Sequence, residues 1–283
     1  MLTNTFCHIP GIGEITESRL WSAGVVSWDS AVGHVPYWLP RPIRDIWNRH
    51  VDESVSNYEL RNARHFAEKL ESCQQWRLYR DFEDCCAFVD IETTGLYLSA
   101  EITTIVLYDG SSIRHYVNGK NLEKFARDVQ DYRVLVTYNG GQFDLPRIEF
   151  RFGIKLTQAH IDLRFALHSL GIRGGLKGCE RQLGINRPGL NDVNGYMAVL
   201  LWHEYEQQGR AKALETLLAY NIQDTLSLHT LMVHAYNQKI RKTPFADSHV
   251  LTPPSLPNNP FKADQAIVKR IRGRFFGSPD RME

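Results

Sequence analysis

The feature that most constrains the fold is a series of short apolar segments that begins at residue 86. The run CAFVDIE alternates between apolar and polar residues and predicts a strand. The runs EITTIVLYDG and SSIRHYVNG predict two more strands, joined by a hairpin at Asp109-Gly110. The helical segment NLEKFARDVQDY and the run RVLVTYN, a buried strand, follow. Strands that meander and then alternate with helices predict an α/β fold with a mixed sheet.

Helices are expected to dominate the rest of the central region. The segment Asp144-Leu145-Pro146 predicts a helix start, because proline is tolerated in the first helical turn. From there to about residue 240 the pattern is mainly helical, with short extended pieces expected near Ile154 and Ile161. We therefore assign residues 76–240 to one α/β domain.

Residues 1–75 are expected to form a small helical region. Gly11 and Gly13 predict a turn ahead of a helix, and residues 54–75 have a helical pattern. The proline-rich residues 34–50 between them are expected to be a packed connector. The turn resembles the hairpin of a helix-hairpin-helix, whose exposed N–H groups can hold a phosphate. The balanced charge of this region instead favours packing against the following domain.

Charge is unevenly distributed along the chain. Residues 81–238 carry 19 acidic and 15 basic side chains, whereas residues 239–283 carry 4 acidic and 9 basic ones. An acidic central region can act on a polyanion if its carboxylates hold metal ions. The tail, residues 241–283, is proline-rich and then basic, and its basic end could contact a nucleic acid or form a solvated terminus. The basic residues concerned are Lys269, Arg270, Arg272 and Arg274.

Composition and cysteine usage are those of a soluble globular protein, with 43% hydrophobic and 23% charged residues. No apolar run reaches the roughly 18 residues that cross a bilayer, and MLTNTFCHIPG lacks the features of a signal peptide. The five cysteines are odd in number and form no CxxC pair. We therefore expect a reducing, cytoplasmic location and no membrane partner. Cys85 and Cys86 are expected to be inert buried thiols.

Acidic residues that could hold metal ions occur in three clusters. Asp90 and Glu92 stand two positions apart on a predicted strand, so both side chains leave the same face, while Ile91 points the other way. Asp144 follows a buried strand, and Asp224 lies on a predicted helix. Two carboxylates on one face repel each other unless a cation lies between them. The first cluster therefore indicates a cation site.

Four carboxylates gathered at one point would bind Mg²⁺ or Mn²⁺ rather than zinc, which prefers histidine and cysteine. Two such ions would stabilise the attacking and leaving oxygens of a phosphoryl displacement. Tyr220 lies four residues before Asp224 and shares its helical face. With an ordinary pKa of about 10, Tyr220 is better suited to orient the attacking water than to act as the base. The alternative is that its ring only packs in the core.

Three sequence motifs, DIETTGL, YNGGQFD and YNIQD, resemble in this order the exonuclease motifs of the DEDD superfamily. The tyrosine four residues before the last aspartate is similar to the DEDDy branch. The stretches HIDLRFALHSLG and GLKGCERQLGI more narrowly resemble bacterial ribonuclease-H-like exonucleases of the YprB type, in which histidine often stands where this chain has Tyr220. The resemblance covers roughly residues 75–238. It implies a ribonuclease-H-like fold, a mixed five-stranded sheet flanked by helices, with a small helical N-terminal element.

The resemblance also implies an activity, 3′–5′ exonuclease cleavage of single-stranded nucleic acid to nucleoside monophosphates, with DNA favoured over RNA. A helicase is a candidate partner. Two Mg²⁺ or Mn²⁺ ions would be held by Asp90, Glu92, Asp144 and Asp224, and Tyr220 would orient the water. The residues that would contact the substrate are Thr93, Thr94, Leu96, Asn139 and Phe143, with Tyr138 as an alternative to Phe143 for base stacking.

Alternatives to these assignments stay open at this point. The substrate-contacting residues are equally well explained as turn and core residues. Asp162 could be a further site acid, although a cap on the helix that begins at Leu163 explains it better. His160 is expected to be structural, because no partner ligand follows at helical spacing. The fold could also serve a non-catalytic nucleic-acid-binding or adaptor protein, or a structure-selective endonuclease that uses the same metals.

Overall fold

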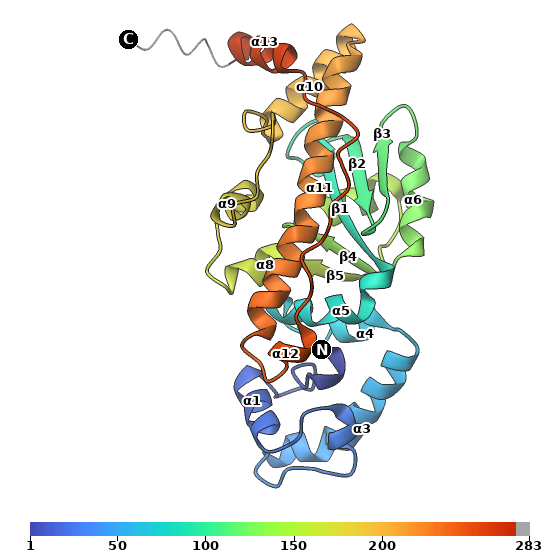
Figure 1. The fold of residues 1–283 in the computed structure, drawn as a ribbon. Helices are drawn as coiled ribbons and strands as arrows, with labels where there is room; N and C mark the ends of the chain where they lie inside the picture. Colours follow the sequence, from blue (N-terminus) through green and yellow to red (C-terminus); the bar gives the residue numbers. More distant parts are fainter. Residues whose placement is uncertain (276–283) are drawn as a thin grey trace.

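A computed structural model describes residues 1–275 of the chain and has a five-stranded mixed sheet at its centre (Figure 1). The strands are β1 (Cys86–Thr93), β2 (Ile102–Tyr108), β3 (Ile113–Val117), β4 (Val134–Thr137) and β5 (Ala159–Asp162). They lie in the order β3-β2-β1-β4-β5. The pairs β1–β2 and β2–β3 are antiparallel, whereas β4 is parallel to β1 and β5 to β4. The predicted mixed five-stranded sheet is confirmed.

The side chains of β1 alternate between two packed layers, as a strand requires. Val89 and Ile91 pack with one set of helices in a separate apolar cluster, whereas Phe88 belongs to the main core on the other face. Asp90 and Glu92 continue the face of Phe88. The helices on the face of Ile91 are η4 (Leu122–Lys124), α6 (Phe125–Asp128), η5 (Val129–Asp131) and α7 (Asp144–Phe152).

The second half of β1 pairs with different strands from the first half. In the described chain, β4 pairs only with residues 86–88 of β1. The β1–β2 register sets Asp90 opposite Val106 and Glu92 opposite Thr104, and a bulge follows Glu92. Bulges locally redirect a strand and often lie next to functional sites. The end of β1 that carries both acids is therefore free of β4 and open to the start of α7.

A helix of 30 residues, α11 (Ala211–Ile240), runs along the face of the sheet that carries the acids (Figure 1). It packs on β1, β2 and the preceding helix, α10. The expected helical character up to residue 240 and the extended piece near Ile161, which is β5, are confirmed. The piece near Ile154 forms no strand in the described chain. The shorter helices before α11 are α8 (Leu163–His168), α9 (Gly175–Gln182) and α10 (Gly195–Gln208).

Helices make up the N-terminal region, as predicted. Its connector, however, was predicted wrongly over the second half of residues 34–50, because α3 already begins at Arg41. Pro42 lies in the first turn of α3, where proline favours a helix. The helix expected over residues 54–75 is broken where α3 ends, and Arg61 adopts a left-handed conformation with φ 51°. The elements are η1 (Leu2–Asn4), α1 (Glu14–Ser22), α2 (Trp28–Ala31), α3 (Arg41–Glu59), α4 (Ala63–Ala67), η2 (Ser72–Leu78), α5 (Tyr79–Phe82) and η3 (Glu83–Cys85).

The N-terminal helices share the main hydrophobic core with the sheet. Trp28, Trp47 and Phe66 belong to the same buried cluster as Phe88 of β1 and Tyr236 of α11. This is the packing that the balanced charge of the region favours. The predicted turn ahead of α1 is present and contains a glycine with φ 85°, at position 11. The boundaries at residues 75 and 240 stay predictions, as does any phosphate contact of this turn.

The tail folds back along α11 as an extended segment after α12 (Ala246–His249) and then forms α13 (Gln265–Phe275) (Figure 1). Asn237 of α11 fixes it by two 2.8 Å hydrogen bonds with the backbone N–H and C=O of Leu251. The basic end is helical, and Arg270 and Arg272 form ion pairs with protein carboxylates. None of the described helices combines the length and apolar character needed to cross a membrane.

We predict that Asn237→Ala releases the extended tail. Losing both backbone hydrogen bonds should lower the free energy of unfolding by about 1–2 kcal/mol and speed proteolysis within residues 250–262. Limited proteolysis with mass spectrometry measures this directly. Gln238→Ala, the neighbouring change on α11, is the control. Equal cleavage rates in Asn237→Ala and Gln238→Ala would show that the hydrogen bonds of Asn237 do not hold the tail in place.

Candidate active site

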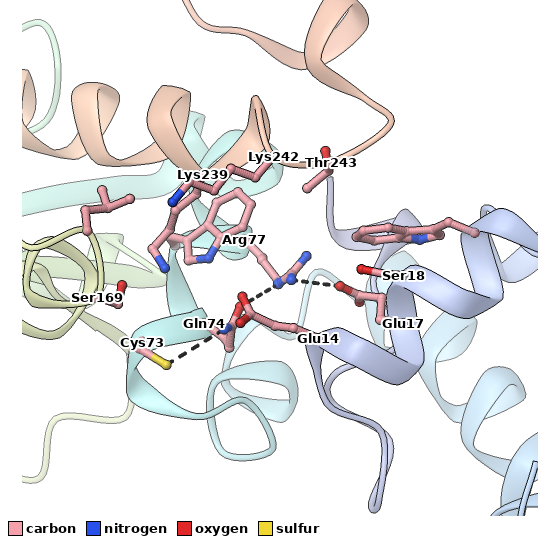
Figure 2. A pocket seen from close by; sticks show the side chains of 13 residues that line it. Glu14, Glu17, Ser18, Cys73, Gln74, Arg77, Ser169, Lys239, Lys242 and Thr243 are labelled. Atoms are coloured by element: carbon pink, nitrogen blue, oxygen red, sulfur yellow. Dashed lines mark hydrogen bonds and ion pairs between the residues drawn. The ribbon is translucent and has the colours of Figure 1, made fainter.

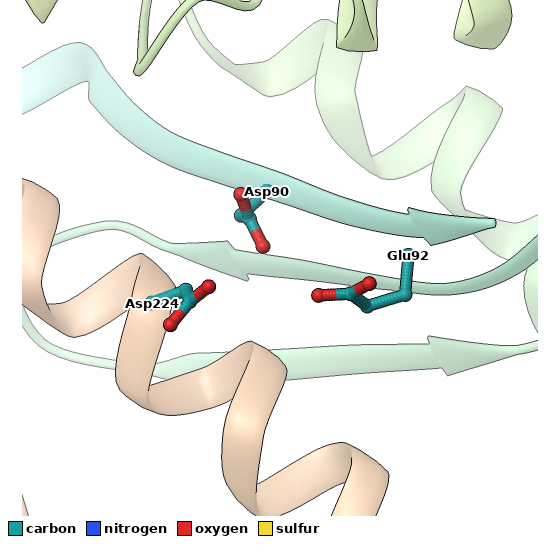
Figure 3. Close-up of side chains that lie close together, drawn as sticks. All are labelled: Asp90, Glu92 and Asp224. Carbon is teal, nitrogen blue, oxygen red and sulfur yellow. The ribbon is translucent and has the colours of Figure 1, made fainter. Parts of the chain in front are cut away.

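Three carboxylates meet between β1 and α11, with Asp90 and Glu92 on the strand and Asp224 on the facing helix (Figure 3). One oxygen each from Asp90, Glu92 and Asp224 lies within 4.8 Å of the other two. The strand supplies two of them from one face, because their positions differ by two. The third comes from the helix that packs across that face. The predicted convergence of these three acids is therefore present in the structure.

Burial and crowding of these acids raise their pKa values. Burial raises the pKa of Asp90 and Glu92 well above the ordinary values, and the charges of Asp224 and Asp144 raise both further. Uncompensated negative charge is costly in such a place. A divalent cation would offset it, and three carboxylates form the oxygen donor set that Mg²⁺ or Mn²⁺ prefers. The residues present therefore fit a divalent metal.

The fourth predicted acid, Asp144, lies beside this group rather than within it. It is the first residue of α7, is buried, and accepts the backbone N–H of Ile91 at 3.2 Å. Burial raises the pKa of Asp144 to about 7, although the N–H of Ile91 works in the opposite direction. Asp144 thus contacts β1 between Asp90 and Glu92, from the edge that β4 leaves open.

Tyr220 lies one turn before Asp224 on α11 and is 4% exposed. Its ring packs in an apolar cluster, with Lys177 Nζ 4.7 Å and the Arg187 guanidinium 5.7 Å from the ring centre. Burial, followed by the charge of Asp224, raises the pKa of Tyr220 above its ordinary range. The phenol is therefore protonated at neutral pH and can donate a hydrogen bond, but cannot serve as a base.

Two residues that the sequence analysis missed orient the acids. Asn221 donates to Asp90 Oδ2 at 2.6 Å and accepts the hydroxyl of Thr104 at 2.9 Å, so α11 and β2 together fix Asp90. Arg187 lies 2.5 Å from Asp224 and binds Glu180 with two nitrogens at 2.5 and 2.8 Å. Asn221 shares a helical face with Asp224, three positions on, and that spacing could have revealed it. Arg187 follows α9 in an irregular segment, and no sequence signal identifies it.

A cavity of about 690 Å³ opens beside Arg187. Three basic side chains, Lys177, Arg181 and Arg187, line it together with Glu180. Since Glu180 is bound to Arg187, the cavity wall carries an excess of positive charge next to the acidic cluster. Burial lowers the pKa of Lys177, and the charge of Asp224 counteracts this. A polyanion could therefore approach the acids over a basic surface.

Three of the predicted substrate-contacting residues lie at the end of β1 and in the loop that follows it. The buried hydroxyl of Thr93 donates to the Gly95 carbonyl at 2.6 Å, and Thr94 Oγ1 accepts the N–H of Glu101 at 3.0 Å. Both threonines thus shape the loop. Leu96 is 83% exposed, and its carbonyl accepts a hydrogen bond from Arg147. The loop holds an exposed apolar side chain four residues beyond Glu92.

The remaining predicted contacts lie in the segment between β4 and α7. Asn139 has φ 61°, and its side-chain oxygen accepts Arg164 at 2.6 Å. The ring of half-buried Phe143 is covered by the Arg147 guanidinium at 3.7 Å. Half-buried Tyr138 packs against the main core. Every predicted contact residue thus has structural partners, and the structure leaves Leu96 the most exposed of them.

Asp162 is confirmed as the cap of α8, since its side chain accepts the N–H of Arg164 at 3.0 Å. It also accepts the N–H of Asn139 at 2.7 Å and so fixes the loop before α7. His160 lies 2.9 Å from the hydroxyl of Thr137, as a structural histidine does. A side chain at Gly140 would collide with Thr137, because an added Cβ would come within 2.1 Å of Oγ1. Glycine is required for this tight turn.

Comparison with known proteins agrees with the fold. The model of the RNase_H superfamily matches residues 87–236, which include all four acids. The match covers more than half of the chain, and the protein therefore belongs to the RNase_H superfamily. The chain is 31% identical over 172 residues to "Uncharacterized protein YprB" of Bacillus subtilis (strain 168), which is 52% of this chain and 41% of that protein. The chain thus matches about two fifths of that relative's length. No solved structure matches it.

We predict that Glu92→Gln distinguishes the effect of the Glu92 charge on thermal stability from the effect of metal binding on thermal stability. Without divalent metal at pH 8, losing one carboxylate should raise the melting temperature, because the raised pKa means that ionised Glu92 destabilises the fold. At pH 5, close to the ordinary pKa of a glutamate, the cost of the raised pKa is smaller, so the same change should matter less. Mg²⁺ should stabilise the wild type by roughly 1–3 kcal/mol at saturating concentration and the variant much less.

Thermal melting in EDTA and in Mg²⁺ at both pH values measures these effects. Glu101→Gln, in the exposed loop nearby, is the control and should respond to Mg²⁺ like the wild type. Equal stabilisation of Glu92→Gln and wild type by Mg²⁺ would show that Glu92 holds no metal.

Proposed function

We propose that the protein is a divalent-metal-dependent 3′–5′ exonuclease that hydrolyses single-stranded nucleic acid, with DNA favoured over RNA, to nucleoside monophosphates. The observation that carries the proposal is the meeting of Asp90, Glu92 and Asp224 within 4.8 Å on a fold of the RNase_H superfamily. The presence of Asp144 and Tyr220 beside them supports a catalytic protein over a non-catalytic adaptor, which could lose any of the five without harm.

The proposed cofactor is a pair of Mg²⁺ or Mn²⁺ ions held by Asp90, Glu92, Asp144 and Asp224. Bound ions of this kind stabilise charge on a phosphate and activate water. The protein's own contribution is to fix the ligands. Asn221 sets the orientation of Asp90, and Arg187 holds the carboxylate of Asp224. The protonated phenol of Tyr220 would donate a hydrogen bond that orients the attacking water.

The surroundings of the acids support a polyanionic, single-stranded substrate. Exposed Leu96 and Tyr97, at 83% and 82%, stand in the loop after β1, where they could contact an unstacked terminal base. Thr93 and Thr94 would place this loop, whereas Asn139 and Phe143 would contact the nucleotide from the opposite segment. The basic cavity at Lys177, Arg181 and Arg187 would receive backbone phosphates. All five cysteines are free thiols, which supports a cytoplasmic location.

The direct experiment uses 5′-labelled single-stranded DNA and RNA of one sequence, incubated in Mg²⁺, Mn²⁺ or EDTA. The wild type should give a metal-dependent ladder that shortens from the 3′ end, faster on DNA. Asp224→Ala should lose activity by at least about 10²-fold, because a metal ligand contributes several kcal/mol to the transition state. Glu215→Ala, on the same helix, is the control. A single internal cut would identify an endonuclease, and intact substrate in every lane would contradict the proposal.

We predict that Tyr220→Phe slows cleavage on the order of 10²-fold, as expected for one lost hydrogen bond in the transition state. The Mg²⁺ concentration that gives half-maximal rate should stay unchanged, because the phenol is not a ligand. Single-turnover rates across a Mg²⁺ titration measure both quantities. An unchanged rate would show that the ring of Tyr220 only packs.

A further inference from the structure

A second polar cavity, of about 290 Å³, lies where α1 and η2 meet the C-terminal end of α11 (Figure 2). Three basic side chains line it, Arg77 from η2, Lys239 from the last turn of α11 and Lys242 just after that helix. Lys239 follows Asp224 by 15 positions, so roughly 22 Å of helix separates this cavity from the acidic cluster. It is therefore a separate site. The hydroxyl-bearing residues at its wall are Ser18, Ser169 and Thr243.

Arg77 is 2% exposed and has more donors than its protein partners use. Its Nη2 lies 2.8 Å from Glu17, and its Nε donates to Gln74 at 3.1 Å. Its Nη1 is buried and meets no acceptor among the described residues. In Figure 2 the guanidinium nitrogen without a dashed line points toward the side of Lys242 and Thr243. Buried N–H groups are nearly always paired, so this donor indicates an acceptor in the cavity.

Two further donors at the cavity lack an acceptor. The indole N–H of Trp76 is buried and unpartnered in the described chain. Lys239 is 8% exposed, and its ammonium lies 5.8 Å from the centre of the Trp76 ring without a carboxylate at ion-pair distance in residues 1–275. Burial lowers the pKa of Lys239, the charges of Cys73 and Glu14 oppose this, and the charges of Arg77 and Lys242 add to the lowering. A bound anion would offset these positive charges.

Two carboxylates also line the cavity, and their partners decide its net charge. Glu17 is fully buried and accepts the hydroxyl of Thr5 at 2.5 Å and the N–H of Phe6 at 2.7 Å, besides Arg77. Arg77 therefore balances Glu17. Glu14 is exposed and leaves the two lysines with one excess positive charge. Unpartnered donors and excess positive charge together fit an anion.

We propose that this cavity binds a phosphate group, supplied either by a free phosphate or mononucleotide or by the backbone of a nucleic acid. A phosphate offers several strong acceptors to one guanidinium, one indole N–H and two ammonium groups. This proposed phosphate site does not depend on nuclease activity, because none of the acids of the metal cluster lines the cavity. The carboxylate of Glu14 repels a bound anion, so removing its charge tests whether the ligand is negatively charged.

Isothermal titration calorimetry of the full chain in EDTA, with inorganic phosphate and with dAMP, tests the site without the metal cluster. The wild type should bind one phosphate group. Lys239→Gln should weaken binding on the order of tenfold, and exposed Lys242→Ala about two- to fivefold. Glu14→Gln should tighten binding. Lys212→Ala, at the other end of α11, is the control and should bind like the wild type, with all folds checked by circular dichroism.

Competition by a single-stranded oligonucleotide in EDTA separates the two sources. If the oligonucleotide displaces phosphate from the wild type and does so less effectively in Lys242→Ala, the site binds a nucleic acid backbone. If phosphate binds but the oligonucleotide does not displace it, the site binds a small molecule. Failure of the wild type to bind phosphate or dAMP would overturn the proposal. So would equal affinity in the wild type, Lys242→Ala and Glu14→Gln. Absence of cleavage in the exonuclease assay would leave this result unaffected.

Discussion

Mutual repulsion among Asp90, Glu92 and Asp224 is the constraint on which the rest of the structure depends. At separations of no more than 4.8 Å, each ionised pair repels by on the order of 3 kcal/mol or more in a partly solvated protein site. Packing elsewhere must hold them together. Phe88 and Ile91 anchor β1 in the cores of its two faces, and the long contact of α11 with β1 and β2 fixes Asp224 opposite. The fold thereby keeps the acids ready for a cation.

The acids of the cluster differ in pKa because their charged and hydrogen-bonding neighbours differ. Arg187, held by Glu180, counteracts the rise that burial causes in the pKa of Asp224. Among residues 1–275 the side chain of Asp90 has one hydrogen-bonding partner, the neutral Asn221, and burial together with the charges of Asp224 and Asp144 keeps the pKa of Asp90 well above the ordinary value. A buried network of this kind is weak evidence for stability, because charges must be removed from water to form it. Its consequence is a set of oriented carboxylates whose proton or metal content depends on pH.

The central architecture could be predicted from sequence because local patterns determine it. Alternation in CAFVDIE sets Asp90 and Glu92 on one face, and helical spacing places Tyr220 with Asp224. Arg187 could not be predicted, since only tertiary packing brings the segment after α9 to α11. The start of α3 was missed because the proline-rich residues 34–50 were interpreted as a connector, although Pro42 lies in the first turn of α3, where proline is tolerated. The path of the tail depends on Asn237, which no local pattern identifies.

The most direct test of the central claim is a crystal structure with Mn²⁺, measured for anomalous scattering. We expect an anomalous peak bounded by Asp90, Glu92 and Asp224, with Asp144 as the ligand nearest a second ion. The same crystals of Asp224→Ala should lose the peak. A map without anomalous density at these acids, in crystals saturated with Mn²⁺, would contradict the account of the cluster as a metal site.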